Sequence, residues 1–291
     1  MIEPILLYGS DLWGASQVCT SNIDKIYLWF IRIVLNIKAT TSNVITMGES
    51  GIIPPKVKCH QNVILYFIRL NSMPTGSVVK NVFLEQKRLH DLGFKNWYSK
   101  VMLLAQSYRI DLQNVEYNES TKKAIKTNIR NAFIQTWKSN LQSLTTNSSL
   151  RTYRTYKNNF EPEPYLSLIN KPKYLTAFAR FRAGSHTLEI ERGRYNNPRT
   201  PIEERLCVNC SHIEDEKHFL TQCISYSNER SKLYEKIAKL YPVFMNFCDD
   251  EKFIFLMKNT NAQILSWTSK FIHDSMLQRS VQHILPVHSS S

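Results

Sequence analysis

Apolar residues recur every three or four positions along most of this chain, and that spacing is typical of amphipathic helices. One run covers residues 23–37, a second covers 63–70, and a longer run steps through Ile125, Ile129, Phe133, Trp137, Leu141 and Leu144. The strict alternation of apolar and polar residues that marks a half-buried strand is scarce. The pattern therefore predicts a mainly α-helical fold with little sheet.

Prolines and polar residues interrupt these helical runs. The polar stretch 145–149 is typical of a linker. Three prolines exclude a continuous helix through residues 160–173, namely Pro162, Pro164 and Pro172. Helical spacing resumes at Tyr174, stops near Gly184, and returns as a predicted pair of closing helices over residues 253–272.

The net positive charge of the chain indicates which kind of partner this helical protein would bind. Lysine and arginine number 37 against 24 acidic residues, which gives a formal net charge of +13 and a pI near 9.4. Such a charge favours a polyanion, either nucleic acid or an anionic membrane surface, although a merely basic protein is the alternative. A hydrophobic content of 43% is enough for a packed core and excludes wholesale disorder.

The sequence offers no sign of membrane insertion or secretion. Its longest apolar stretch, 26–37, is interrupted by Arg32 and is shorter than the roughly 20 residues of a spanning helix. The N-terminal residues include Glu3 and lack the basic start of a signal peptide. We therefore expect an intracellular protein of the nucleus or cytoplasm, with no membrane partner.

Three of the six cysteines lie close together in a spacing that suits a metal site. The motif reads Cys207-x2-Cys210-x7-His218-x4-Cys223. Thiolates and imidazoles are the ligands that zinc prefers, and four protein ligands leave no open position for catalysis, so the motif predicts a structural zinc site. His212 is an alternative fourth ligand, and three reduced cysteines near a helix start are the simpler reading. The acidic stretch 214–216 is expected to form the first turn of the following helix, where negative charge is favourable.

These motifs resemble the C-terminal part of LINE-type (non-LTR) retrotransposon reverse transcriptases. The likeness is strongest over 181–223, where FRAGSHTLEIERGRY leads through Pro201 and Arg205 into the cysteine motif. In that family an arginine-rich stretch precedes a Cys-Cys-His-Cys zinc knuckle. Residues 4–14 resemble the family's segment between the palm and the thumb, and 251–257 resemble its tail.

The resemblance implies a particular organisation of the chain. Residues 1–150 would form a thumb-like and helical linker bundle. Residues 151–291 would hold the arginine-rich segment, the knuckle-like module at 207–223 and the C-terminal helices. The partner implied is RNA or DNA, bound without sequence specificity.

One departure from the family removes the expectation of catalysis. Reverse transcriptases hold two metal ions with an aromatic-x-Asp-Asp turn in the palm, which should precede Tyr8. The only such letters here are 247–250, FCDD, which follow the knuckle and are expected to form a solvated acidic turn. The upstream endonuclease is also missing. We therefore expect a non-catalytic fragment without palm and endonuclease, and not an enzyme.

Two basic regions supply candidate nucleic-acid contacts. Residues 120–160 carry eight basic residues and no acid, and a second group of arginines lies beside the cysteine motif. Arginine and lysine neutralise phosphates, and exposed aromatic rings stack on bases. The candidate contacts are Arg151, Arg154, Tyr156, Arg180, Arg182, Arg192, Arg194 and Arg205. Tyr153 is a further stacking candidate, whereas Phe133 and Trp137 are expected in the core.

Two functional hypotheses follow from the sequence. The first is a nucleic-acid-binding, non-catalytic segment of a reverse transcriptase with a structural zinc site. The alternative is a zinc-stabilised structural or protein-interaction module with no nucleic-acid role. Salt-dependent binding to RNA distinguishes the two, because phosphate contacts release counterions and protein contacts do not.

Overall fold

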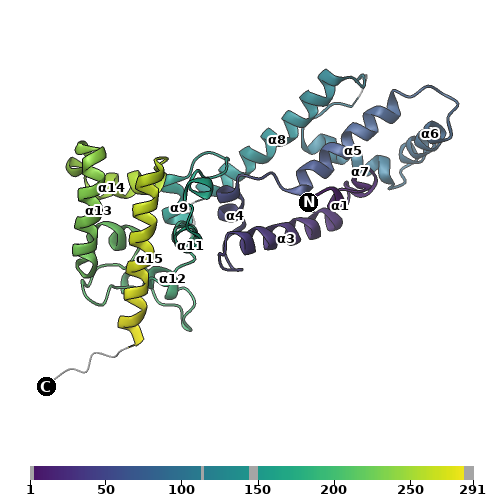
Figure 1. Cartoon of the computed structure of the whole chain (residues 1–291). Helices are drawn as coiled ribbons and strands as arrows, with labels where there is room; N and C mark the ends of the chain where they lie inside the picture. The colour runs from purple at the N-terminus through teal and green to yellow at the C-terminus, as the bar shows by residue number, and fades with distance from the viewer. Residues whose placement is uncertain (1–2, 113–114, 144–149, 285–291) are drawn as a thin grey trace. The chain divides into compact units, whose positions relative to one another are not determined.

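The computed structural model describes residues 3–112, 115–143 and 150–284, and it confirms a mainly α-helical fold (Figure 1). Within these ranges the only β pairing is one isolated antiparallel bridge between Leu206 and Ile213. None of the described helices is long and apolar enough to cross a membrane. The predicted linker 145–149 and the apolar position Leu144 lie outside the described residues.

The chain forms two compact units that are not contiguous in sequence. Unit 1 consists of Met1–Phe30 and Ile52–Gln142, and unit 2 consists of Ile31–Gly51 and Ser143–Ser291. The division differs from a single cut near residue 150, because the segment Ile31–Gly51 belongs with the C-terminal residues. The reason is physical: this segment carries Glu49, whose charge is neutralised by an arginine of unit 2.

Unit 1 is built around one central helix. Its helices are α1 (Glu3–Leu6), α2 (Ser10–Trp13), the first part of α3 (Gln17–Val34), α5 (Pro55–Asn71), α6 (Val78–Asp91), α7 (Trp97–Ser107) and α8 (Glu119–Gln142). Helix α5 contacts α2, α6, α7 and α8. It begins at Pro55, where a fixed φ suits the first helical turn and no amide hydrogen is needed.

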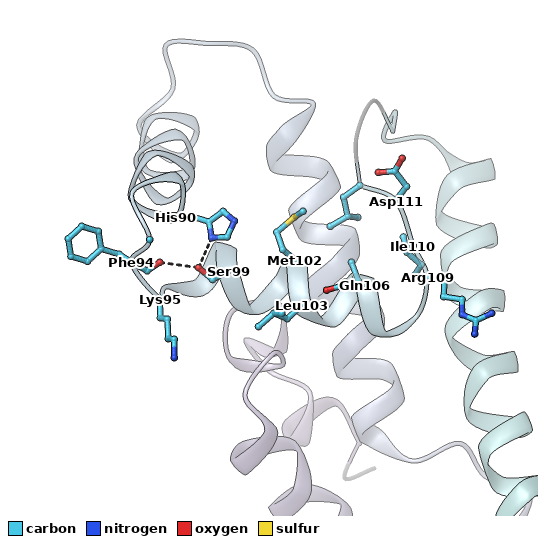
Figure 2. Close-up of a pocket in the computed structure, with 13 residues that line it drawn as sticks. His90, Phe94, Lys95, Ser99, Met102, Leu103, Gln106, Arg109, Ile110 and Asp111 are labelled. Atoms are coloured by element: carbon cyan, nitrogen blue, oxygen red, sulfur yellow. Dashed lines mark hydrogen bonds between the residues drawn. The ribbon is translucent and has the colours of Figure 1, made fainter.

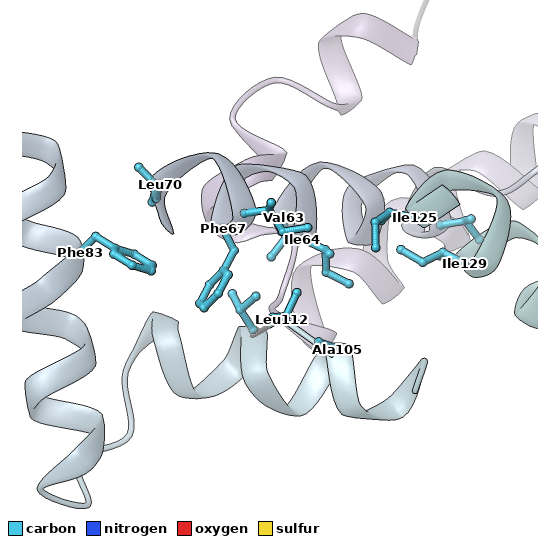
Figure 3. Packing of buried hydrophobic residues seen from close by; sticks show 12 residues of the cluster. Val63, Ile64, Phe67, Leu70, Phe83, Ala105, Leu112, Ile125 and Ile129 are labelled. Carbon is cyan, nitrogen blue, oxygen red and sulfur yellow. The ribbon is translucent and has the colours of Figure 1, made fainter. Parts of the chain in front are cut away.

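The core of unit 1 follows the apolar stripe of α5, as Figure 3 shows. Val63, Ile64 and Phe67 of α5 meet Ala105 of α7 and Ile129 of α8. Each of these side chains is buried, and burying one large aliphatic or aromatic side chain contributes about 1.5–3 kcal/mol. The helical spacing read over 63–70 and over 125–133 therefore marks two sides of the same core.

Unit 2 collects the remaining helices around α15. They are α4 (Asn43–Ser50), α9 (Leu150–Tyr156), α10 (Tyr165–Leu168), α11 (Pro172–Arg182), α12 (Glu189–Arg192), α13 (Ser227–Leu240), α14 (Asp249–Lys258) and α15 (Ala262–Ile284). Short turns connect them, namely η1 (Ile202–Glu204), η2 (His218–Gln222), η3 (Ile224–Tyr226) and η4 (Pro242–Asn246). Helix α15 packs against α11, α10, α13 and α14 (Figure 1). The closing helical pair predicted over 253–272 is thus confirmed as α14 and α15.

A buried ion pair joins the early segment of unit 2 to the late one. Arg182 on α11 donates from Nε and Nη2 to the two carboxylate oxygens of Glu49 on α4, each at 3.0 Å. Its Nη2 also lies 2.7 Å from an oxygen of Glu163, and its Nη1 donates to the carbonyl of Met257. Tyr165 adds a hydroxyl donated to Glu49 at 2.7 Å. The charges of Arg182 hold the pKa of Glu49 below its usual range, although burial by itself would raise it.

Gly51 permits this arrangement. It ends α4 with a φ of 60°, which L side chains rarely adopt, and a β-carbon at this position would collide with the backbone of Pro162. The amide of Glu163 donates to the carbonyl of Glu49 at 3.1 Å. Close backbone approach, and not side-chain packing alone, therefore fixes α4 within unit 2.

Candidate metal centre

The structure brings the four residues of the cysteine motif together. The sulfurs of Cys207, Cys210 and Cys223 and a ring nitrogen of His218 all lie within 4.8 Å of one another. The three cysteines are reduced. Cys207, His218 and Cys223 are buried, and Cys210 is half-buried. The predicted four residues thus form a group that could hold one metal ion.

The cysteine sulfurs are spaced like the corners of a coordination shell. Cys223 Sγ lies 3.8 Å from Cys207 Sγ and 3.7 Å from Cys210 Sγ. These separations are far longer than the roughly 2.05 Å of a disulfide bond, and they match the edge expected when two thiolates share one ion. The fourth candidate ligand, His218, is also available to a metal ion, because neither nitrogen of its buried ring has a hydrogen-bond partner in the described part of the chain.

A tight turn aims Cys207 and Cys210 at the same point. The amide of Cys207 donates to the carbonyl of His212 at 2.7 Å, and the amide of Ser211 donates to the carbonyl of Cys207 at 3.0 Å. Ser211 closes the turn with a φ of 55°. Cys210 Sγ accepts a hydrogen bond from the amide of Ile224 at 3.4 Å, which is the kind of contact that stabilises a thiolate.

The other two candidate ligands are placed by an unusual turn of helix. In an α-helix, residues five apart point about 140° away from each other, so His218 and Cys223 would diverge. Here η2 is a π-helical turn, closed by the amide of Cys223 donating to the carbonyl of His218 at 2.8 Å. A hydrogen bond between two residues five apart widens the helical turn, so that these two residues lie on the same side of the helix. The π turn therefore makes the four-residue gap compatible with a shared ion.

The environment of the cluster makes a cation favourable. Burial raises the pKa of the Cys207 thiol, and burial raises the pKa of Cys223 to about 12. Burial also lowers the pKa of His218 and so favours the neutral ring, which is the form that binds metals. A bound cation deprotonates coordinating thiols outright and offsets the cost of burying them.

His212, the alternative ligand, has a different role in the structure. Its Nδ1 lies 2.7 Å from the carbonyl oxygen of Cys210. Its ring is stacked on that of His218, with centroids 5.9 Å apart and planes at 15°. His212 therefore covers the group of four from the exposed side and is not part of it.

The acidic stretch that precedes His218 fixes the module within unit 2. Asp215 accepts a hydrogen bond from the amide of His218 at 2.8 Å, so it caps the helical turn as an acidic N-terminal residue does. Glu214 lies outside the helix and accepts two hydrogen bonds from Arg279 of α15, at 2.8 and 2.6 Å. Asp215 therefore lies at the start of the helix, as predicted, whereas Glu214 lies before the helix and binds Arg279 of α15.

Glu216 is turned away from the group of four. It is buried between Nε2 of His186 at 3.0 Å and the hydroxyl of Thr152 at 2.8 Å, with Arg151 at 3.3 Å. Burial alone would raise its pKa, but the hydrogen bond and charge of His186 and the charge of Arg151 bring it to about 2. Glu216 thus links its own turn to α9 and to the segment after α11.

Three of the predicted nucleic-acid contacts are buried, and for these the expectation is corrected. Arg182 is 2% exposed and is neutralised by Glu49 and Glu163. Tyr156 is buried and donates its hydroxyl to the carbonyl of Arg182 at 2.7 Å. Arg205 is buried and donates to the carbonyls of Ile190 and Thr200. Side chains held inside the fold by such bonds do not reach a phosphate or a base. Tyr153 is likewise buried.

The other predicted contacts lie nearer the surface, with different degrees of engagement. Arg192 and Arg194 form ion pairs with Glu189 and Glu191 one helical turn away. Arg151 is engaged by Asp215 as well as by Glu216. Arg180 is exposed, and Arg154 is half-buried. The predicted basic contacts therefore divide into arginines that are held by other residues of the fold and arginines that remain accessible at the surface.

The acidic letters at 247–250 form the start of α14. Asp249 and Asp250 occupy its first turn, where they favour the helix dipole. Asp250 lies 2.9 Å from Lys217, and its side chain is largely exposed. Gln222 donates to Asp249 at 3.0 Å. These partners suit an acidic helix start.

A cleft of about 800 Å³ opens in unit 1 between the turn after α6, α7 and the segment that follows α7 (Figure 2). Figure 2 shows His90 and Ser99 hydrogen-bonded within it, at 2.9 Å. The hydroxyl of Ser99 also accepts from the amide of Asn96 and lies 3.1 Å from the carbonyl of Phe94. Because these bonds cap the first turn of α7, we assign the pair to helix capping and not to nucleophilic chemistry.

Comparison with protein-family profiles, curated proteins and solved structures finds no significant match to this chain. The resemblance to LINE-type reverse transcriptases is therefore carried by the motif residues alone.

Sequence reasoning missed two accessible residues of unit 2. Tyr195 ends the motif-bearing run 181–195, and Lys38 lies far away from it in the chain. In the structure the Lys38 ammonium is 5.8 Å from the centre of the Tyr195 ring. The basic neighbours of Tyr195 were a usable signal, whereas the approach of Lys38 depends on the fold.

Proposed function

We propose that the group Cys207, Cys210, His218 and Cys223 binds one structural zinc ion. Zinc binds thiolates at about 2.3 Å in a tetrahedron, whose edge between two sulfurs is then about 3.8 Å. The observed separations of 3.7 and 3.8 Å support this geometry. The ion would crosslink the turn before the π-helical segment to the residue after it. Four protein ligands leave no place for a reacting water, so the role is structural.

Metal analysis of purified, reduced protein tests this proposal. We expect close to one zinc per chain, lost in Cys210→Ser. Cys19→Ser is the matched control, because Cys19 is an exposed cysteine outside the group and its loss should leave the zinc content unchanged. Protein that contains no zinc, and takes up none when zinc is added under reducing conditions, contradicts the proposal.

We propose further that the chain is a nucleic-acid-binding, non-catalytic segment similar to the thumb-to-knuckle region of a LINE-type reverse transcriptase. The observation that carries binding is the surface of α8 in unit 1. Lys123, Lys126, Arg130 and Lys138 are exposed along it, and the sequence from 120 to 160 contains no acid. Lys123, Lys126 and Arg130 fall within an arc of about 60° around the helix. The one acid of this helix, Glu119 at its first residue, pairs with Lys122 and lies near Lys126, so the cations exceed the acid along this face. A basic stripe of this kind suits a row of phosphates.

The salt dependence of binding is the decisive measurement. With the full chain and a single-stranded oligonucleotide, log affinity should fall linearly with log salt, by about 0.7 for each phosphate contacted. Lys126→Ala and Arg130→Ala should each weaken binding on all sequences and flatten the slope. Lys232→Ala and Lys258→Ala remove the same charge from exposed positions of unit 2. If these controls cost as much as the α8 variants, binding reflects net charge only.

The absence of polymerase activity is part of the same proposal. We expect that the chain does not extend a primed template with magnesium or manganese. Asp249 and Asp250 are the residues to test, because they alone carry the aromatic-x-Asp-Asp letters. Primer extension that is abolished by Asp249→Ala would overturn the non-catalytic reading.

The second candidate is a zinc-stabilised structural or protein-interaction module. The observation in its favour is that Arg182, Arg205 and Tyr156 are buried, which removes three of the expected nucleic-acid contacts. This reading predicts that affinity for oligonucleotides depends on total charge and on no particular side chain. The comparison of the α8 variants with their controls therefore decides between the two candidates.

A further inference from the structure

The segment after α12 forms a closed loop at residues 193–200 of unit 2 (Figure 1). Its neck is a hydrogen bond from the amide of Thr200 to the carbonyl of Gly193, at 3.0 Å. Asn196 donates from its side chain to the hydroxyl of Thr200 at 2.8 Å. The loop is therefore held in shape by its own bonds.

Buried Arg205 supports this loop from below. Its guanidinium donates to the carbonyl of Thr200 at 2.7 and 3.0 Å and to that of Ile190 at 2.7 Å. The absence of a side chain at Gly193 leaves room for Arg205, because a β-carbon there would lie 2.8 Å from Nε of its guanidinium. Arg205 thus rigidifies the loop and adds a positive charge beneath it that carbonyl groups do not cancel.

Tyr195 projects from this supported loop with 58% of its surface exposed. Its hydroxyl lies 3.2 Å from that of Thr40, which fixes the end of the ring. Lys38 lies 5.8 Å from the ring centre, and its ammonium donates to the carbonyl of His186 at 3.0 Å. An exposed aromatic ring that is anchored at its tip is suited to stacking, because little conformational freedom is lost on binding.

Further basic side chains lie on the segments that carry Lys38 and Tyr195. Within the described residues, neither Lys38 nor Arg180 forms an ion pair with a carboxylate; Arg180 instead donates to the carbonyl and side chain of Asn36, both at 2.7 Å. Arg194 and Arg199 stand at the two ends of the loop, next to its neck. The charges of Arg199 and Arg194 lie close enough to Arg205 to help lower its pKa, after burial.

The acidic residues near the loop include two that are paired, one of them with a cation of the loop itself, and two that are exposed. Glu189 pairs with Arg192 and Arg279, and Glu191 pairs with Arg194. The exposed acids Glu203 and Glu204 follow on η1. The surface therefore combines one stacking ring with several cations, which is the composition of sites for single-stranded nucleic acid.

We propose that the 193–200 loop is a nucleotide-binding site, in which Tyr195 stacks on an unpaired base of single-stranded RNA or DNA while Lys38 contacts the flanking phosphate. The inference rests on the proposed nucleic-acid function and assigns it a particular surface in unit 2. Arg205 is a positioning residue here, since it shapes the loop and touches no nucleotide.

Binding of the full chain to labelled dT and rU dodecamers, followed by fluorescence anisotropy over a salt series, tests the site. Tyr195→Ala should weaken binding by about fivefold or more with an unchanged salt slope, because stacking releases few counterions. Tyr195→Phe keeps a ring that can stack but loses the contact with Thr40, so its affinity should lie between those of Tyr195→Ala and the original chain. Lys38→Ala should weaken binding and flatten the slope. Comparing the dT and rU arms shows which sugar the site prefers.

Two controls keep the outcomes distinct. Tyr8→Ala removes another exposed ring, 87% exposed, that lies in unit 1 and outside α8. Heparin is a polyanion without bases, so Tyr195→Ala should leave its binding unchanged. If the chain binds neither dodecamer, the proposed function fails. If it binds both, but Tyr195→Ala behaves like Tyr8→Ala or weakens heparin equally, the stacking site alone is overturned. Circular dichroism of each variant confirms its fold.

Discussion

At the scale of single residues, burial decides what each arginine does. Arg180 and Arg182 are two positions apart on α11, so they point to different sides of the helix. Arg180 is exposed and rests on Asn36, whereas Arg182 is enclosed by Glu49, Glu163 and three aromatic rings. A buried charge is tolerated only when its partners neutralise it, so the Arg182 network has little tolerance for partial removal.

Arg182→Ala should therefore destabilise unit 2 strongly. It would leave Glu49 buried without its partner, and breaking a buried pair in this way costs about 3–5 kcal/mol. Arg180→Ala is the matched control and should cost less than about 1 kcal/mol. Urea unfolding followed by tyrosine and tryptophan fluorescence measures both. Equal losses for the two variants would contradict the assignment of Arg182 to the core.

His60 in unit 1 gives the stability of the chain a dependence on pH. Its Nδ1 lies 2.7 Å from the hydroxyl of Tyr108, and the charge of Lys56 is nearby. Burial first, and Lys56 second, lower the pKa of His60 to about 4. The unfolded chain takes up a proton below pH 6.5, which the folded chain resists until about pH 4. Stability is therefore full above pH 6.5 and falls as the pH drops towards 4, by about 2 kcal/mol at pH 5.

An NMR titration of the His60 ring should give this low pKa directly. His60→Gln keeps a polar partner for Tyr108 but has no proton to gain. Between pH 6.5 and 4, the unfolding free energy of this variant should therefore fall less than that of the original chain. An unchanged pH profile would mean that His60 titrates alike in the folded and unfolded chains.

At the scale of elements, the π-helical turn depends on its cap. Asp215→Ala removes the acceptor for the amide of His218, and losing such a cap costs about 1 kcal/mol. If zinc organises the module, the same variant should lower zinc affinity about fivefold in competition with a chelator. Asp215→Asn retains the acceptor and should behave almost like the original chain. Equal weakening by both variants would point to charge and not to capping.

The elements divide into those that the sequence predicts and those that only the fold reveals. The runs over 63–70 and 125–141 predict helices because a one-sided core requires their spacing. The close grouping of Cys207, Cys210, His218 and Cys223 follows from ligand chemistry. The π turn has no such signature, since it depends on hydrogen-bond register. Burial of Arg182 could not be foreseen either, because its partner Glu49 lies 133 positions earlier in the chain.

At the scale of the whole molecule, the two units should respond differently to metal removal. If zinc binding contributes folding energy to unit 2, a chelator under reducing conditions should increase amide hydrogen exchange near the ligands, from η2 to the start of α13. The core of α5 in unit 1 should keep its protection, because its contacts are with α2, α6, α7 and α8. Equal loss of protection in α5 would show that the two units unfold together.

The ion pair between Glu49 and Arg182 also sets an order of events during synthesis. Glu49 leaves the ribosome 133 residues before Arg182, and the whole of 52–142 is made in between. Until then the carboxylate of Glu49 has no arginine to neutralise it and stays hydrated, since burying it alone is unfavourable. Unit 1 can therefore fold while the segment 31–51 waits for its partners, and a growing chain that has released residues 1–142 but not yet Arg182 would carry an unpaired α4.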